Sequence, residues 1–354
     1  MEFAVMDVPA GNLKTKNLTN LKFGELFTDR MFVMEYSPAK GWHSARIEGF
    51  HNFSLSPATM VFHYAQEIFE GMKAFTYKGG KTALFRPMEN LRRMNDSAER
   101  LAMPKFDADL VMKALLELVK LEKGWVPQQK DTSLYIRPTM IGTDPVIKVR
   151  ASDNYLFYII LSPVGPYFSS GASMSKIIVE DTYVRASKGG MGFAKTGGNY
   201  AASIKAGKEA AKKGFDQVLW LDAEERMFAE EVGSMNIFFV IEDTLVTPEL
   251  DGVILPGITR KSVIELAKYL KLKVVERKVP IAEVVEGLQD GRVSEVFGTG
   301  TACVVNPVGT LGYKGKEFRV GEGKPGKFAT QLYDHLTGVQ YGEKEDAFGW
   351  MTVL

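Results

Sequence analysis

A proline- and glycine-rich stretch near the middle of the chain most constrains its fold. Residues 162–171, SPVGPYFSSG, hold two prolines and two glycines and show no apolar periodicity, which is typical of a linker. The chain has 354 residues, and a single hydrophobic core usually divides beyond roughly 250–300 residues. We therefore predict two domains, residues 1–162 and 175–354, joined by an interdomain loop over residues 163–174.

Strand-like and helix-like segments alternate on both sides of this stretch. In the first part we predict strands at 28–36, 46–55, 71–77, 82–86, 134–138 and 155–161, and helices at 58–70, 88–101 and 108–121. In the second part we predict strands at 217–221, 236–241, 273–277 and 295–297, and helices at 201–213, 259–270, 282–288 and 327–337. The pattern indicates a mixed fold of α/β and α+β character.

The composition argues against several classes of partner. A formal net charge of +1 gives no electrostatic reason to expect nucleic acid or an anionic membrane. The most apolar run, residues 155–161, is far shorter than the ~20 residues that a membrane helix needs. Residues 1–20 include Glu2 and Asp7 and lack the apolar core of a signal peptide. We expect a soluble, cytoplasmic protein.

Cysteine and histidine usage argues against a metal centre. Cys303 is the only cysteine, so the chain can form neither an internal disulfide nor a cysteine-rich metal site. The 4 histidines show no metal-ligand spacing. We expect no bound metal.

Two glycine-rich loops match nucleotide-binding motifs incompletely. Residues 321–327, GEGKPGK, have the spacing of a triphosphate loop, but Phe328 stands where a Ser or Thr hydroxyl should meet magnesium. Residues 298–303, GTGTAC, begin like a dinucleotide fingerprint but end in Cys303, and no long helix opens there. A nucleotide-dependent enzyme that uses Lys327 remains an alternative, which titration with ATP would test.

One lysine stands in a context that favours catalysis. Lys195 lies in GFAKTGGNY, beside the Gly197–Gly198 pair and before a helix-forming segment. Glycines let a ligand approach the backbone closely. Lysine forms imines with carbonyl cofactors, provided that its amine is uncharged. The alternative is a surface turn with a solvated lysine.

Three later segments could complement Lys195. The Glu230–Glu231 pair precedes an apolar strand, on which its side chains point to opposite faces, and Glu231 could hold a proton on a heterocyclic nitrogen. The Pro256–Gly257 turn opens a helix whose first amides suit a phosphate. Residues 297–302, FGTGTA, offer amides and hydroxyls to a phosphate or a carboxylate. An exposed acidic pair, an ordinary helix cap and a plain turn are the alternatives.

The order and content of several strings carry a resemblance that covers the chain from about residue 27 onward. These strings are EGMKAF (70–75), LFRP (84–87), SLYIRP (133–138), KTGGNY (195–200), EEVGSMN (230–236), GVILPGITR (252–260) and EVFGTGTACVVNPV (295–308). Together they resemble branched-chain amino-acid aminotransferases, which are fold-type IV enzymes dependent on pyridoxal 5′-phosphate. The resemblance implies a small N-terminal domain, a larger C-terminal pseudo-barrel domain, and the cofactor in the cleft between them.

The resemblance also implies a cofactor site. Lys195 matches the catalytic lysine that carries the cofactor as an aldimine and shuttles the substrate proton. Glu231 matches the partner of the pyridine nitrogen, and Tyr200 matches the partner of the phenolic oxygen. The phosphate would be bound by residues that match Arg93, Ile258, Thr259 and Thr301.

The implied substrate pocket combines apolar walls with carboxylate-binding groups. Ser234 and the backbone at Ala302 match the site for the α-carboxylate, and Arg137 matches the arginine that accepts the side-chain carboxylate of glutamate. The apolar wall matches Phe27, Tyr64, Phe69, Tyr135, Tyr167 and Val149, the last of them from a partner subunit. Because one methylene is worth only ~1–3 kcal/mol in such a pocket, leucine, isoleucine and valine should all be substrates.

The resemblance implies ping-pong transamination with 2-oxoglutarate by a homodimer. Some relatives carry a second cysteine in the loop after the Gly/Thr segment, but only Cys303 is present here, so we expect no disulfide regulation. The alternatives are a D-amino-acid aminotransferase, an aminodeoxychorismate lyase, and a phosphate-ligand binding protein without catalysis. Assays with L-leucine, D-alanine and aminodeoxychorismate would separate the enzymes, and the spectrum of the purified protein would identify a non-catalytic binder.

Overall fold

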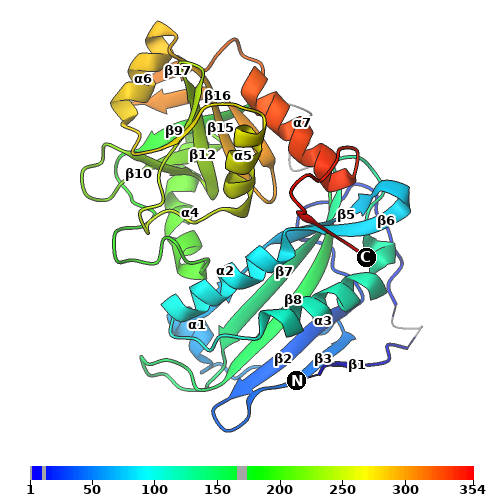
Figure 1. Ribbon diagram of the computed structural model, residues 1–354. Helices are drawn as coiled ribbons and strands as arrows, with labels where there is room; N and C mark the ends of the chain where they lie inside the picture. Colours follow the sequence, from blue (N-terminus) through cyan, green and yellow to red (C-terminus); the bar gives the residue numbers. More distant parts are fainter. Residues whose placement is uncertain (1, 10–12, 166–173) are drawn as a thin grey trace. The chain divides into compact units, whose positions relative to one another are not determined.

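The computed structural model describes residues 2–9, 13–165 and 174–354, which divide into two compact units (Figure 1). The first unit comprises Met1–Tyr167, Ala194–Gly197 and Gly338–Leu354. The second unit comprises Phe168–Phe193 and Gly198–Thr337. The short segment that carries Lys195 therefore belongs to the first unit. Most of the interdomain loop predicted at 163–174 lies outside the described residues.

A mostly antiparallel, nine-stranded sheet forms the first unit. Its strands run in the order β1-β3-β2-β8-β7-β5-β6-β18, and β4 pairs with β7. The strands are β1 (Ala4–Val5), β2 (Arg30–Ser37), β3 (Gly41–Gly49), β4 (Glu67–Phe69), β5 (Met72–Tyr77), β6 (Lys81–Phe85), β7 (Ser133–Gly142), β8 (Tyr155–Val164) and β18 (Met351–Val353).

Two long helices cover one face of this sheet, in front of β7 and β8 in Figure 1. Leu91 and Met94 of α2 and Leu115 of α3 are fully buried in one core with Phe157 and Ile159 of β8. The helices of this unit are α1 (Met60–Tyr64), α2 (Pro87–Arg100) and α3 (Ala108–Leu121), with the 3-10 turns η2 (Lys78–Gly80) and η3 (Lys123–Trp125). Burying both helices on the sheet fixes the position of every side chain on the inner face of α2.

The helix predicted at 58–70 is wrong in its second half. The chain leaves the helix at Ala65, whose backbone is left-handed at φ 49° and ψ 36°, and Glu67–Phe69 continues as strand β4 on β7. Val61, Tyr64 and Ile68 have helical spacing, but Ile68 is buried as part of strand β4 and not on a helix face. The strand predicted at 46–55 lies earlier, at Gly41–Gly49.

The sheet of the second unit closes on itself. Its strands run in the order β11-β10-β9-β16-β15-β12-β13-β14, and a further pairing of β11 with β12 completes a ring of strands. This ring confirms the pseudo-barrel expected for the second half. The strands are β9 (Ser175–Glu180), β10 (Gln217–Leu221), β11 (Ala229–Val232), β12 (Met235–Ile241), β13 (Thr244–Thr247), β14 (Val274–Glu276), β15 (Val293–Gly300), β16 (Val304–Tyr313) and β17 (Lys316–Arg319).

The helices of the second part of the chain lie close to their predicted positions. They are α4 (Gly197–Lys212), α5 (Ile258–Tyr269), α6 (Ile281–Asp290) and α7 (Lys327–Tyr341). Strands β9, β13, β16 and β17 were not predicted; β13 and β17 have only four residues each, too few to show alternation. Across the described ranges, no helix combines the length and the apolar character needed to cross a bilayer.

An aromatic pair supports the part of the ring that leads to the Gly/Thr loop. Phe238 of β12 and Phe297 of β15 are cross-strand partners, and their rings stack at 5.4 Å between centroids with an angle of 11°. Neither side chain is exposed to solvent. Directly opposed aromatic residues stabilise a sheet through contact area and ring stacking.

We expect Phe297→Ala to lower the free energy of unfolding by ~3–5 kcal/mol, because it leaves a cavity at a fully buried site. Urea unfolding followed by circular dichroism measures this loss. Phe297→Leu, which keeps much of the apolar volume, should lose clearly less. A loss below about 1 kcal/mol for the alanine variant would contradict the importance of this pair.

Candidate functional site

The backbone of Lys195 is attached to the first unit on both sides. Its N–H donates to Ser97 Oγ on α2 at 2.9 Å, and its carbonyl oxygen accepts the N–H of Phe69 on β4 at 3.0 Å. The hydroxyl of Thr196 donates to the carbonyl oxygen of Glu67 at 2.7 Å. The amine of Lys195 lies 5.0 Å from the centroid of the Phe69 ring. A helix and a strand therefore hold the main chain from which this side chain extends.

Arg93 lies on α2 in a buried ionic pair. Its Nε and Nη2 donate to the two carboxylate oxygens of Glu70 at 2.7 and 2.9 Å, and Asn90 Nδ2 donates to the same carboxylate at 2.8 Å. Burial would raise the pKa of Glu70, but Arg93 and the charge of Lys195 outweigh it and lower that pKa below its usual range. Glu70 is therefore an anion that balances the cations around it.

Arg137 lies between aromatic rings in the same unit. Its guanidinium carbon is 4.7 Å from the centroid of Phe69 and 5.3 Å from that of Tyr135, and Nη2 donates to the Tyr135 hydroxyl at 3.0 Å. Its Nε is buried and has no hydrogen-bond partner among the described residues. This combination provides apolar walls and a cationic donor in one place. It suits a pocket that accepts both an aliphatic side chain and a carboxylate.

Glu231 in the second unit is held by two partners. Its carboxylate lies 2.5 Å from Nη2 of Arg185 and accepts Asn236 Nδ2 at 3.2 Å, across the β11–β12 pair. The side chains of Glu231 and Arg185 are almost completely buried. Arg185 also donates to the carbonyl oxygen of Val253 at 2.6 Å. The carboxylate thus has a fixed orientation within its unit.

The start of helix α5 and Thr299 of β15 both lie next to Asn236. Helix α5 begins after Gly257, which is extended and provides no side-chain cap, so its first amides can bind a ligand anion. A Cβ at Gly257 would overlap Asn236 Oδ1, so a larger residue would have to displace the Asn236 side chain. Thr299 is the cross-strand partner of Asn236, and its buried hydroxyl has no hydrogen-bond partner in the described chain.

Uncapped amides and an unsatisfied hydroxyl beside a carboxylate suit a phosphorylated heterocycle. In the same unit, Thr301 and Ala302 lie in the turn between β15 and β16, Ser234 lies in the turn between β11 and β12, and Tyr200 lies on α4. The donors of the second unit therefore fit pyridoxal 5′-phosphate: amides for the phosphate and Glu231 for the ring nitrogen.

The structure groups the predicted residues by unit. The first unit holds Phe27, Tyr64, Phe69, Arg93, Tyr135, Arg137, Val149 and Lys195, and the second holds Tyr200, Glu231, Ser234, Ile258, Thr259, Thr301 and Ala302. Phe27 stacks on Phe50 at 5.4 Å, whereas Val149 is 82% exposed. The predicted pocket residue Tyr167 lies outside the described residues.

Sequence reasoning missed Glu70, Arg185 and Asn236. Glu70 is the first residue of the string EGMKAF and Asn236 the last of EEVGSMN. Both strings carry the family resemblance, but neither residue was given a cofactor or substrate role. Arg185 lies in an irregular segment, ten residues before Lys195, where no pattern distinguishes it. Its partner is Glu231, far along the chain, and only the fold brings the two together.

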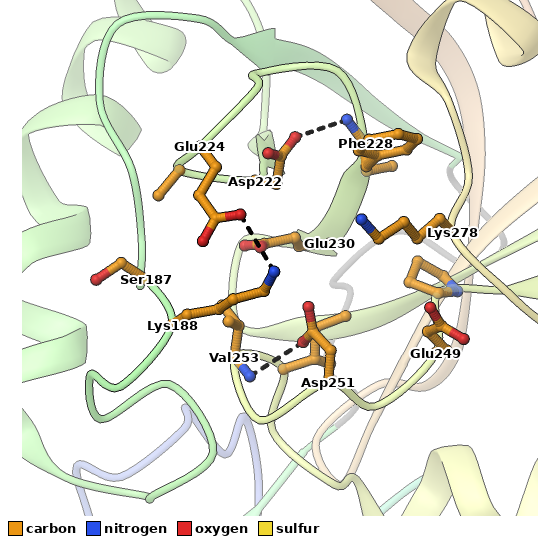
Figure 2. Close-up of a pocket in the computed structure, with 14 residues that line it drawn as sticks. Ser187, Lys188, Asp222, Glu224, Phe228, Glu230, Glu249, Asp251, Val253 and Lys278 are labelled. Carbon is orange, nitrogen blue, oxygen red and sulfur yellow. Dashed lines mark hydrogen bonds and ion pairs between the residues drawn. The ribbon is translucent and has the colours of Figure 1, made fainter.

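A small acidic cavity of about 40 Å³ lies elsewhere in the second unit (Figure 2). The residues that line it include none of those predicted to bind cofactor or substrate; its charged members are Lys188, Asp222, Glu224, Glu230, Glu249, Asp251 and Lys278. Throughout the described part of the chain, no group of three or more His, Cys, Asp or Glu could hold a metal ion. Burial raises the pKa of Glu230 to about 8; Arg185 opposes this shift, and the neighbouring carboxylates add to it.

The family model and the relatives that match this chain are all named as aminotransferases. The family model "Amino-transferase class IV" matches residues 67–311. The "Branched-chain-amino-acid aminotransferase 2" of Bacillus subtilis (strain 168) is 50% identical over 332 residues, which cover 94% of this chain and 92% of that protein.

Solved structures of branched-chain amino acid aminotransferases have the same fold. The enzyme from Escherichia coli gives a TM-score of 0.72 at 26% identity and covers 91% of this chain and 98% of that one. The T.th. enzyme, solved with pyridoxamine 5′-phosphate, gives a TM-score of 0.76 at 27% identity and covers 91% of this chain and 97% of that one.

The raised pKa of Glu230 predicts a pH-dependent cost of folding. The folded state binds this proton more tightly than the unfolded chain, whose carboxyl titrates near 4.5, so the free energy of unfolding falls as pH rises from there to about 8. Glu230→Gln removes this cost, and its advantage over wild type should grow by about 3 kcal/mol between roughly pH 5.5 and 8.5.

Urea unfolding at the two pH values measures this difference. Glu224→Gln is the matched control, because that carboxylate lines the same cavity but is 56% exposed. An advantage of the Glu230→Gln variant that stays constant with pH would show that the buried carboxyl is not the titrating group.

Proposed function

Because this chain belongs to the class IV aminotransferases, and among them to the branched-chain amino-acid aminotransferases, we propose that it transfers amino groups from L-leucine, L-isoleucine and L-valine to 2-oxoglutarate. The products are the branched 2-oxo acids and L-glutamate, and the cofactor is pyridoxal 5′-phosphate. The observation that carries this proposal is the 50% identity to a branched-chain aminotransferase over 94% of the chain. The D-amino-acid aminotransferase, the lyase and the non-catalytic binder have no comparable support.

The residues that match the family's cofactor site would hold the cofactor. Arg93, Ile258, Thr259 and Thr301 would bind its phosphate, Tyr200 its phenolic oxygen and Glu231 its ring nitrogen, with Lys195 at its aldehyde carbon. When bound, the cofactor supplies a carbonyl and an electron-withdrawing ring for the amino group of the substrate. Arg93 belongs to the predicted N-terminal domain, residues 1–162, and the other cofactor residues belong to the predicted C-terminal domain, residues 175–354.

Lys195 would move the proton that the reaction requires. In the first half-reaction its amine would take the proton from the α-carbon of the amino acid and deliver it to the cofactor carbon that carried the aldehyde; in the second it would move a proton in the opposite direction, onto the α-carbon of the glutamate that forms from 2-oxoglutarate. The fixed backbone at Phe69 and Ser97 limits the positions that this amine can reach. Glu231, whose carboxylate is paired with Arg185, would accept a hydrogen bond from the protonated ring nitrogen of the cofactor.

The residues around Arg137 would let one pocket bind two kinds of substrate. Phe69 and Tyr135 give the aliphatic side chain an apolar surface, and Phe27, Tyr64 and Tyr167 would extend it. When glutamate binds, the guanidinium of Arg137 offers its donors to the side-chain carboxylate. The α-carboxylate would be bound by Ser234 and the backbone at Ala302 in both cases.

We also propose that the working unit is a homodimer. Val149 and Ile147 project from the loop between β7 and β8 and are 82% and 69% exposed, although both are apolar. Asp144 anchors that loop through Arg150 and the backbone N–H of Asp153. A rigid loop with exposed apolar side chains suits insertion into a partner subunit. A cytoplasmic location is consistent with a sequence that has one cysteine and so no internal disulfide.

Lys195→Ala is expected to lower the rate of amino transfer from L-leucine by at least ~10²–10⁴-fold, because it removes the proton-transferring amine. Borohydride reduction of the wild-type enzyme, followed by peptide mapping, should place a pyridoxyl group on Lys195. The exposed Lys205→Ala variant should retain wild-type activity. A label on another lysine would refute the assignment.

Val149→Asp is expected to raise the KM for L-leucine by roughly tenfold, because the variant loses the apolar side chain that the proposed dimer would bury in the substrate pocket of the partner subunit. Light scattering should give wild type twice the mass of one chain and detect any dissociation of the variant. Val275→Asp, at an exposed apolar position in the second unit, serves as the control. A monomeric, fully active wild type would refute the dimer.

A further inference from the structure

The carboxylate of Glu70 lies close to two residues of the proposed cofactor site, Arg93 and Lys195. Glu70 is completely buried, and it accepts hydrogen bonds from Arg93, Asn90 and the N–H of Gly71. It is adjacent in sequence to Phe69, whose N–H binds the carbonyl oxygen of Lys195. None of the cofactor or substrate roles given above involves Glu70.

One face of α2 carries the two side chains that donate hydrogen bonds to this carboxylate. Asn90, Arg93 and Ser97 are three and four residues apart, so they lie on the same side of the helix. Asn90 and Arg93 bind Glu70, and Ser97 binds the backbone N–H of Lys195. The helix face therefore connects the arginine and the lysine through the segment that bears Glu70.

We propose that Glu70 is a positioning residue that fixes the guanidinium of Arg93 in the orientation in which it binds the cofactor phosphate; this inference depends on the proposed function. A carboxylate that takes two donors from one guanidinium fixes both its plane and its rotation. A guanidinium has further donors on its other edges, and these give the phosphate a binding direction. Without Glu70, the arginine would keep its charge but lose its orientation.

A purely structural role is the competing explanation. A buried ion pair often adds little net stability compared with apolar residues of the same size, because desolvation of both charges is costly. Loss of a merely structural pair would weaken every ligand of the apoprotein alike. Loss of a positioning residue would weaken only ligands that carry the phosphate.

The test measures the affinity of the apoprotein for pyridoxal 5′-phosphate and for pyridoxal, which lacks the phosphate. Both titrations follow tryptophan fluorescence, so neither depends on catalysis. We expect Glu70→Gln to weaken pyridoxal 5′-phosphate binding by ~10- to 100-fold, the usual range for a charge-assisted hydrogen bond. Pyridoxal binding should change by less than about twofold.

Glu122→Gln is the matched control, because Glu122 also forms a buried pair in the first unit. It lies 2.8 Å from Nη1 of Arg30, accepts the N–H of Asp29, and is 1% exposed in its side chain. This variant should be less stable than wild type but should keep the wild-type preference for the phosphorylated ligand. If it loses that preference to the same extent, the inference is overturned.

Further outcomes are equally decisive. Unchanged binding by Glu70→Gln, or equal weakening of both ligands, overturns the proposal. If circular dichroism shows that Glu70→Gln does not fold, Glu70→Asp replaces it; a shorter carboxylate should cause a smaller loss that is still specific to the phosphate, and equal losses would overturn the role. If wild-type apoprotein binds neither ligand, the proposed function fails instead.

Discussion

The hydrogen bonds on either side of Lys195 are the constraint on which the rest of the site depends. A lysine side chain has four rotatable bonds, so its amine can be placed only if the backbone below it is fixed. Here a strand amide and a helix hydroxyl fix it, and both come from elements whose opposite faces are buried in the core of the first unit. The core thus determines where the reactive nitrogen can lie.

Two charged residues of the proposed cofactor site, Arg93 and Glu231, each have a counter-charge inside their own unit. In the first unit the pair is Glu70 with Arg93, and in the second it is Glu231 with Arg185. Leaving one member of such a pair unpartnered in the interior would cost several kcal/mol, so the pairs must form as the units fold. The orientation of these groups therefore precedes ligand binding, which is the condition for electrostatic catalysis at low reorganisation cost.

The sequence alone was sufficient for the family and for most long elements. Lys195 and Glu231 stood in strings whose order is specific, and the long helices α2, α3 and α5 have clear apolar periodicity. The failures have physical causes. The helix predicted at 58–70 ended early because one residue, Ala65, adopts a left-handed conformation that no local pattern announces. Arg185 could not be found because its role depends on a pairing with a residue far along the chain.

The first unit is discontinuous, and this has a consequence for how the protein folds during synthesis. Strand β18 of this unit pairs with β6 at the edge of the sheet. Residues 194–197 also belong to this unit, and in the sequence most of the second unit lies between them and β18. Domains usually fold as the ribosome releases them, N-terminal first. Here the edge of β6 can be paired with β18 only after residues 351–353 have left the ribosome. During translation that unpaired strand edge is exposed, and a chaperone that covers β-edges would shorten the period in which it can aggregate.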